Sequence, residues 1–179
     1  MKKLFILMLI MAVNCSLSGQ TPLTFTKIIK TDSVGIPANF NNVKDWFISS
    51  YNNAKAVIQS EDKTDGIIIG KAKEKFFLDI WCNCTDGFID YIIKIHIKEN
   101  RFKVEICNFT HIGQYDTPAM CILGLITDAP AETINGNMGC NKKAWIKMQA
   151  TCKTLSESIF TSIEQQFNNL LKSDPNSNW

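Results

Sequence analysis

The sequence predicts an α+β protein, with a curved antiparallel sheet of about five to six strands and one short and one long C-terminal helix packed on one face. Apolar residues recur at helical spacing through a last segment, from Trp145 to Leu170. Several central segments alternate apolar and polar side chains, the period of a half-buried strand. The order strand, helix, several strands and long helix is typical of a sheet covered on a single side.

The first half of the chain is expected to hold short strands around one helix. Residues 24–29 alternate and are rich in β-branched side chains, which predicts a first strand that Gly35 and Pro37 end. From Asn41 or Asn42, which are good N-cap residues, apolar side chains recur at intervals of three and four residues. This spacing predicts a helix to about residue 53. The next expected elements are a strand, an Asp-Gly turn and a further strand, over residues 55–59, 62–66 and 67–73.

Three strands with clear alternation are predicted to follow. The first, over residues 76–84, places on one face Phe76, Leu78, Ile80, Cys82 and Cys84. The second, over residues 91–98, points inward with Tyr91, Ile93, Ile95 and Ile97. After a tight turn at Glu99-Asn100, the third points inward with Phe102, Val104 and Ile106, and outward with Arg101, Lys103, Glu105 and Cys107.

The remaining chain divides into an irregular excursion, a long helix and a tail. Residues 110–141 contain several Gly and Pro residues and one apolar run, 121–126, which allows one extra strand. Residues 142–171 are predicted to form the long helix, and the polar residues 173–179 a flexible tail. Residues 20–172 are therefore expected to form a single domain.

The N-terminus has the pattern of a secretory signal peptide over residues 1–19. Lys2 and Lys3 precede an unbroken apolar run, 4–13, which is too short to span a membrane. Small residues at Ser16 and Ser18 predict cleavage near residues 18–20, so the protein is expected to be periplasmic or extracellular. The alternative is a lipoprotein attached through Cys15, although Asn14 fits poorly before a lipidated cysteine.

The charge balance argues against a nucleic-acid partner. The chain has 19 Lys and Arg and 17 Asp and Glu, and the first 20 residues contain Lys2 and Lys3 but no acid, so removal of the signal peptide leaves 17 of each. Nucleic-acid binding proteins derive much of their affinity from a basic excess that contacts phosphates. No second apolar run has membrane-spanning length, so no integral span is expected after cleavage.

The stretch of residues 46–73 resembles a family of secreted bacterial domains of unknown function with a TBP-like fold (domain of unknown function 4468). The residues that fit the pattern are Trp46, Tyr51, Ala54, Lys55, 57–59, the turn at Asp62, Gly66 and 68–71. Residues 92–106 resemble its paired strands, with Lys98-Glu99-Asn100-Arg101 in place of the usual Lys-Asp-Gly-type turn. The resemblance implies a fold and no activity, and "TBP-like" does not imply DNA binding.

The motif Trp81-Cys82-Asn83-Cys84-Thr85-Asp86-Gly87 raises the question of metal binding or redox chemistry. Two cysteines two apart on a strand point the same way, here to the apolar face, which favours core packing or a disulfide. A zinc site through Cys82 and Cys84 is the weaker alternative, since it needs four ligands and the chain has only two histidines. The disulfide candidates are Cys82, Cys84, Cys121, Cys140 and Cys152, with no pairing fixed by the sequence.

Residues 110–141 are the expected location of a binding site, as one wall of a cleft against the sheet edge. Irregular segments of this length are uncommon in compact domains unless they are functional, and binding residues favour loops on a rigid scaffold. The candidate ligand-binding residues are Gln114, Tyr115, Asp116 and Met138. The alternative is that the apolar run is an edge strand with a purely structural role.

No catalytic motif is evident in the sequence. The patterns of serine hydrolases, zinc proteases, phosphate-binding loops and EF-hands are missing, and no cofactor is expected. The sequence therefore favours a non-enzymatic binding or structural module of the cell envelope, with an envelope protein or a small ligand as partner. The alternative is a thiol- or metal-dependent factor or enzyme that uses the region of Cys82 and Cys84.

Overall fold

The computed structural model describes residues 20–31, 35–78, 84–114, 118–134 and 139–172. The strands are β1 (Phe25–Lys30), β2 (Ile58–Asp62), β3 (Ile67–Phe76), β4 (Gly87–Lys98), β5 (Arg101–Gly113) and β6 (Gly124–Leu125). The helices are α2 (Ile36–Ser50), α3 (Ala54–Val57) and α4 (Gly139–Lys172), with 3-10 turns η1 (Ala119–Cys121) and η2 (Ala131–Thr133).

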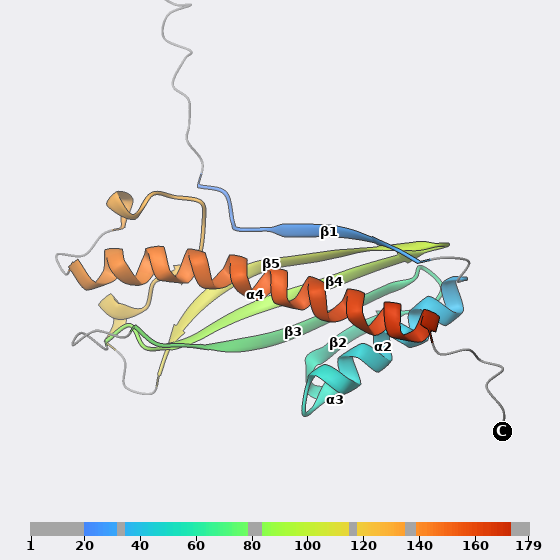
Figure 1. The fold of residues 1–179 in the computed structure, drawn as a ribbon. Coiled ribbons are helices and arrows are strands. Elements are labelled where there is room, and N and C mark those ends of the chain that lie inside the picture. Colours follow the sequence, from blue (N-terminus) through green and yellow to red (C-terminus); the bar gives the residue numbers. More distant parts are fainter. Residues whose placement is uncertain (1–19, 32–34, 79–83, 115–117, 135–138, 173–179) are drawn as a thin grey trace, which may run out of the picture.

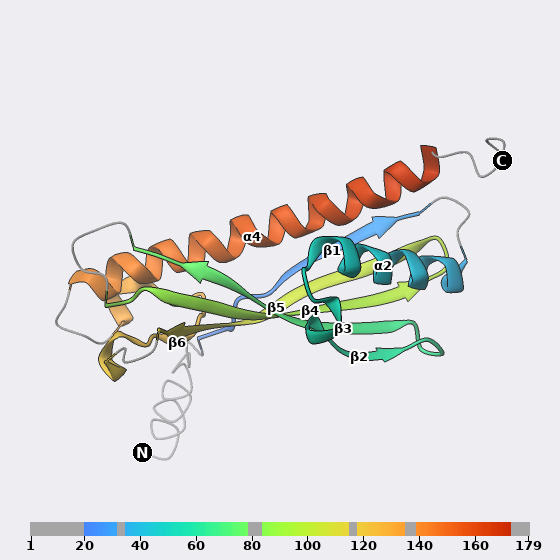
Figure 2. The ribbon, with the colours of Figure 1, turned by 90° about the horizontal axis from the view of Figure 1, so that it is seen from below.

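The strands form one antiparallel six-stranded sheet, in the order β1-β5-β4-β3-β2, with β6 paired to the far part of β5. The helix α4 runs along one side of this sheet, and α2 and α3 lie toward one end of the molecule (Figure 1). Figure 2, turned by 90°, shows α4 as a layer separate from the strands. The predicted α+β class and its antiparallel sheet are confirmed.

The apolar stripe of α4 covers the sheet as its spacing predicts. The stripe is buried at Trp145, Met148, Cys152, Ile159, Ile163 and Phe167. The Phe167 ring lies 4.6 Å from that of Phe102 on β5, and Lys27 on β1 forms an ion pair with Glu164 at 2.9 Å. The inward residues predicted for β4 and β5 are all buried beneath this layer. None of the helices in the described ranges is long and apolar enough to cross a membrane.

Helix α2 fills the remaining part of the same face. Its side chains Val43, Trp46 and Phe47 are buried, and the Trp46 indole N–H donates to the Ser162 hydroxyl of α4 at 3.0 Å. The Phe47 ring lies over Gly70 on β3, where an added Cβ would approach Phe47 Cε1 to 2.7 Å. Gly70 therefore allows the close contact between helix and strand.

The predicted strand over residues 76–84 is wrong in its described part, residues 76–78 and 84, and residues 79–83 lie outside the described residues. β3 continues to Phe76, which pairs with Gly87 at the start of β4, so the ladder ends there and the chain must reverse direction. The Leu78 amide donates to the Asp86 carboxylate at 2.8 Å instead of to a neighbouring strand. Leu78 is nevertheless buried, which explains why the apolar alternation persists beyond the strand.

β5 is longer than predicted, because a bulge lies in its middle. Cys107 pairs with Ile92 and Thr110 pairs with Asp90, so two residues of β5 lie opposite one residue of β4. Asn108 within the bulge has a φ of 56°. The extra residue reverses the alternation, so Phe109 and His111 point into the core while Cys107 stays on the side of Lys103 and Glu105.

Two boundaries in the first half also differ from the prediction. α2 begins at Ile36 rather than at Asn41, because Pro37 lies in the first turn, where its missing N–H removes no helical hydrogen bond. Residues 55–57, predicted as strand, form the single helical turn α3, which Asn53 caps by accepting from the Ala56 amide. The strand β2 starts only at Ile58.

Candidate functional site

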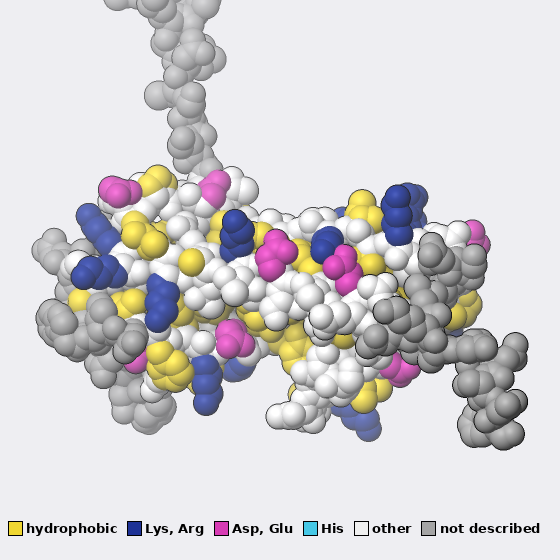
Figure 3. Space-filling model, viewed as in Figure 1, with side chains coloured by type: hydrophobic (Ala, Val, Ile, Leu, Met, Phe, Trp, Pro, Cys, Tyr) yellow, Lys and Arg dark blue, Asp and Glu magenta, His cyan; other side chains and the backbone are white. Residues whose placement is uncertain are grey.

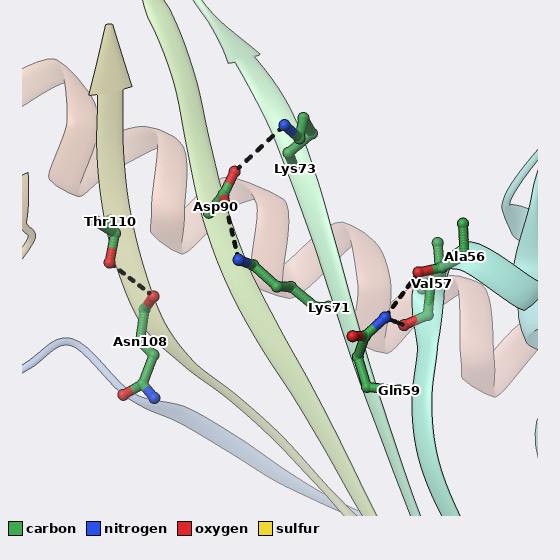
Figure 4. Close-up of polar contacts among 8 residues, drawn as sticks. All are labelled: Ala56, Val57, Gln59, Lys71, Lys73, Asp90, Asn108 and Thr110. Carbon is green, nitrogen blue, oxygen red and sulfur yellow. Dashed lines mark hydrogen bonds and ion pairs between the residues drawn. The ribbon is translucent and has the colours of Figure 1, made fainter.

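In the described part of the chain, no helix packs on the side of the sheet away from α4 and α2, and we call this side the helix-free face. It carries the alternate residues of the strands whose other residues form the core. The register arranges these residues in rows across neighbouring strands. Figure 4 shows part of this face, with α4 passing behind the strands.

The charges on one part of the helix-free face neutralise each other. The Asp90 carboxylate, in a residue only 7 % exposed, forms ion pairs with Lys71 at 3.2 Å and Lys73 at 3.9 Å (Figure 4). Nearby, the Gln59 amide donates to the carbonyls of Ala56 and Val57. A hollow of about 440 Å³ lies at this edge of β3, but its charged side chains already have partners.

The centre of the face is organised around Glu105. Its carboxylate accepts from Lys94 and from Lys103, each at 3.4 Å. Burial alone would raise the pKa of Glu105, but the hydrogen bonds from the two lysines outweigh it and lower the pKa below its ordinary value. Glu105 is therefore ionised at neutral pH and holds both lysine side chains across the strands.

Lysine and arginine side chains gather around His96 at the end of the face next to the β4–β5 turn, and we call this the cationic end: Lys30, His96, Lys98, Arg101 and Lys103. Lys98 lies directly opposite Arg101 in the register, and Lys30 flanks Arg101 on the other side. In the next row, Lys103 lies between His96 and Ile28. Directly opposed like charges destabilise a sheet, so this arrangement costs stability.

The cationic end encloses a shallow cavity with an apolar floor. The cavity has a volume of about 420 Å³ and is lined by Ile28, His96, Lys98, Arg101, Phe102 and Lys103. The Ile28 side chain is 60 % exposed among these cations. Within the described ranges, Lys30, Lys98 and Arg101 form no ion pair, and only Lys103 contacts an acid, Glu105. The site therefore combines uncompensated positive charge with exposed apolar surface.

The opposite side of the molecule has a different charge pattern. On the side that α4 covers, basic and acidic side chains are interspersed along the helix (Figure 3). One such pair is the contact between Lys27 and Glu164. Opposite charges at close range cancel much of each other's field. The uncompensated cations of the cationic end are thus a local property of one end of the helix-free face.

Of the four predicted binding residues, one lies among the residues that the structure describes. Gln114 is exposed and directly follows β5, whereas Tyr115, Asp116 and Met138 lie outside the described residues. Cys82 also lies outside them. The described residues contain no group of three side chains that could hold a metal ion.

The described cysteines have different surroundings. Cys140 is in a disulfide, and Cys107 and Cys152 carry free thiols. Burial raises the pKa of Cys152 to about 12 and also raises that of Cys107. Cys84 is half-buried in a turn, and its thiol is a neighbour of the Cys121 thiol that contributes to raising the pKa of Cys121. Raised pKa values disfavour the thiolate, so Cys107 and Cys152 lack the activation of catalytic cysteines.

The residues of the cationic end were not predicted as a site. Arg101 and Lys103 were predicted to point outward, and Lys98 follows the inward residue Ile97 in the same alternation, which was the available signal. What was missing is that β1 pairs with β5 across a long stretch of chain, which brings Ile28 and Lys30 beside them. A non-local strand pairing of this kind leaves no local pattern in the sequence.

Comparison with known proteins agrees with the fold. A TBP-like protein from Parabacteroides distasonis ATCC 8503 superposes with a TM-score of 0.61 at 17 % identity, over 87 % of this chain and 99 % of that one. A DUF4468 family protein from Bacteroides ovatus ATCC 8483 superposes with a TM-score of 0.57 at 14 % identity, over 93 % of this chain and 95 % of that one. At these identities the likeness concerns the fold alone, and no curated protein matches the chain.

A family model covers the central part of the chain, from β1 into β5. It matches residues 25–111 and is described as "Domain of unknown function (DUF4468) with TBP-like fold". These residues include Trp46, Gly70 and the paired strands β4 and β5, on which the resemblance in sequence rests. Residues 25–111 are thus a domain of the DUF4468 family, with its TBP-like fold.

Proposed function

We propose that this protein is an exported, non-enzymatic binding module of the cell envelope that holds an anionic ligand at the cationic end. The observation that carries the proposal is the row of Lys30, Arg101 and Lys98, which form no ion pair among the described residues and lie next to the row of the exposed Ile28. The fold bears the repulsion between these cations, and an anion would relieve it. Export is supported by Lys2-Lys3 and the short apolar run that follows them.

The site favours an amphiphilic small molecule with a phosphate or carboxylate group. The guanidinium of Arg101 can bind such a group through two parallel hydrogen bonds, and Lys98 and Lys30 add charge on either side. An apolar part of the same ligand would cover Ile28, which otherwise remains in water. The cavity of about 420 Å³ has the size of a small-molecule site.

A nucleic-acid strand fits this face less well. Proteins that bind single strands follow the phosphate backbone with a continuous positive groove. Here Glu105 and Asp90 lie on the same face and neutralise Lys94, Lys71 and Lys73, so the positive charge ends after two rows of the sheet. The surface therefore suits a compact anion rather than an extended chain of phosphates.

The experiment is a binding titration of the mature protein with octyl phosphate, with inorganic phosphate and octyl glucoside as single-feature probes. We expect octyl phosphate to bind more tightly than either probe, and increasingly weakly as salt is added. The double variant Lys98→Glu/Arg101→Glu should weaken binding at least about tenfold, since a charge-assisted hydrogen bond contributes about 1.5–3 kcal/mol.

The matched control is Lys143→Glu/Lys153→Glu, which makes the same change in net charge at exposed positions of α4. It should bind octyl phosphate within about twofold of the unmodified protein, because the two lysines lie on the other side of the sheet. Equal losses in both double variants would show that only net charge matters. That result, or no binding by the unmodified protein, would refute the site.

A further inference from the structure

Two thiol-bearing segments that are distant in sequence meet beside the end of the sheet. Cys84 lies in the turn before β4, and Cys121 ends the 3-10 turn η1. The pKa of Cys121 is raised to about 11 by burial and by the neighbouring thiol of Cys84. Cys121 is buried, whereas Cys84 is half-buried and so remains accessible to a reagent in solution.

His111 on β5 holds both segments in place. Its Nε2 lies 3.0 Å from the carbonyl of Thr85, the residue after Cys84. Its Nδ1 accepts from the amide of Leu123, two residues after Cys121, at 3.1 Å. Because the ring is buried and contacts one segment through each nitrogen, it fixes the separation of the two cysteines from the rigid strand between them.

Strand pairing restrains the same two segments independently. Gly87, just after the Cys84 turn, pairs with Gly113 on β5, where an added Cβ would meet the Ile112 carbonyl oxygen. Gly124, just after Cys121, pairs with His111 through β6. The backbone around each cysteine is therefore anchored to β5, and neighbouring thiols held in this way need little further movement to form a bond.

We propose that Cys84 and Cys121 form a disulfide in the mature protein, in addition to the disulfide of Cys140. The Cys84 thiolate attacks the disulfide of an oxidant, either a protein thiol oxidase or oxidised glutathione, and releases one thiol. The Cys121 thiol then loses its proton, attacks the Cys84 sulfur and releases the second thiol. Two cysteines are oxidised and one disulfide is reduced, with the mass of the protein lower by two hydrogen atoms.

This bond would tie the segment between β5 and β6 to the β3–β4 connection. The bond would close the stretch from residue 84 to residue 121 into a loop, which restricts the unfolded chain. Cys107 and Cys152 do not compete for the pairing. Cys107 lies on the helix-free face opposite Ile92, and Cys152 is buried in α4. An exported location would favour the oxidised form.

The test is peptide mapping of the mature protein after treatment with oxidised glutathione, alkylation at acidic pH and cleavage before aspartate. This cleavage places Cys121 in residues 116–127, apart from Cys140 and Cys107, and places Cys84 together with Cys82 in residues 79–85. We expect a disulfide-linked product that contains both of these peptides and releases them on reduction. Cys84→Ser should abolish the link, whereas Cys82→Ser, Cys107→Ser and Cys152→Ser should retain it.

Two results would overturn the inference. The first is recovery of residues 116–127 with Cys121 alkylated after oxidation of the unmodified protein. The second is survival of the link in Cys84→Ser together with its loss in Cys82→Ser, which would assign the bond to the other cysteine of the motif. Circular dichroism of each serine variant shows whether it remains folded, so that loss of the link is not mistaken for unfolding.

Discussion

His111 shows how one buried side chain can organise segments that are far apart in sequence. It is 1 % exposed and touches the edge of the Phe76 ring at 5.9 Å between centroids. The Leu123 amide must donate to Nδ1, so Nε2 carries the proton and donates to the Thr85 carbonyl in the neutral ring. Burial lowers the pKa of His111 below its ordinary value, although the Thr85 carbonyl partly opposes this.

This environment predicts a loss of stability on mild acidification. The unfolded chain takes up a proton on His111 near pH 6.5, whereas the folded protein does so only at lower pH. The contribution of His111 to the free energy of unfolding should therefore be constant above about pH 7 and fall as the pH drops through 6.5. The slope due to this one group is at most about 1.4 kcal/mol per pH unit.

Denaturant unfolding at several pH values between 8 and 5 measures this dependence. His111→Gln keeps a donor and an acceptor but cannot titrate. The variant should be less stable at pH 8, and its free energy of unfolding should change less between pH 7.5 and 5.5 than that of the unmodified protein. A variant with the same pH slope as the unmodified protein would exclude His111 as the source. Glu105 does not interfere, because its lowered pKa acts only in more acidic solution.

At the level of elements, β5 depends on the bulge at Asn108. The φ of 56° at this residue is open to glycine and tolerated by asparagine, but it is unfavourable for a β-branched side chain. The Asn108 carbonyl also accepts from the Thr110 hydroxyl at 3.3 Å (Figure 4). The bulge thus lets one strand present Cys107 outward and Phe109 inward without a break.

Substitutions at Asn108 should separate backbone strain from side-chain contacts. Asn108→Val is expected to lower the free energy of unfolding by about 1–2 kcal/mol, whereas Asn108→Gly should change it by less than about 0.5 kcal/mol. Urea denaturation measures both. Equal destabilisation by the two substitutions would indicate that the asparagine side chain, and not the backbone conformation, is what the bulge requires.

The docking of α4 on the sheet is tested by a charge placed in its apolar stripe. Ile159 is 7 % exposed, so Ile159→Asp would bury an unpaired carboxylate and should lower the free energy of unfolding by about 3–5 kcal/mol. Ser158→Asp, at the neighbouring exposed position, is the control and should change it by less than about 0.5 kcal/mol. A thermal melt unchanged by Ile159→Asp would contradict this packing.

At the scale of the whole molecule, one side of the sheet stabilises the fold while the other is open for binding. All the helices longer than one turn in the described ranges pack on one side, so the strands can present charged residues on the other without disturbing the core. This division is why the helix-free face can carry opposed cations at one end and neutral ion-pair clusters elsewhere.

Export is the prediction that concerns the complete chain. Mass spectrometry of the protein from its native envelope should find a new N-terminus between Gly19 and Thr21, because Ser16 and Ser18 have the small-x-small pattern of a cleavage site. A protein that retains Met1 would contradict export through a cleaved signal. A lipid mass on Cys15 would instead show a membrane-attached lipoprotein.

The sequence by itself determined the features that depend on local periodicity. The inward residues of β4 and β5, the turn at Glu99-Asn100 and the long helix α4 follow from alternation and helical spacing, which are set by backbone geometry alone. The order strand, helix, several strands and long helix followed from the same patterns, and the family resemblance implied the TBP-like fold. The end of β3 at Phe76 could not be predicted, because Leu78 keeps the strand pattern while serving only to fill the core.

Only the tertiary structure decided which residues meet across the chain. The pairing of β1 with β5 brings Ile28 and Lys30 to the cationic end, and the bulge at Asn108 turns His111 inward. His111 then joins the segments that carry Cys84 and Cys121. These contacts link residues far apart in sequence, and they form because the whole sheet and α4 bury apolar surface together, which no local pattern encodes.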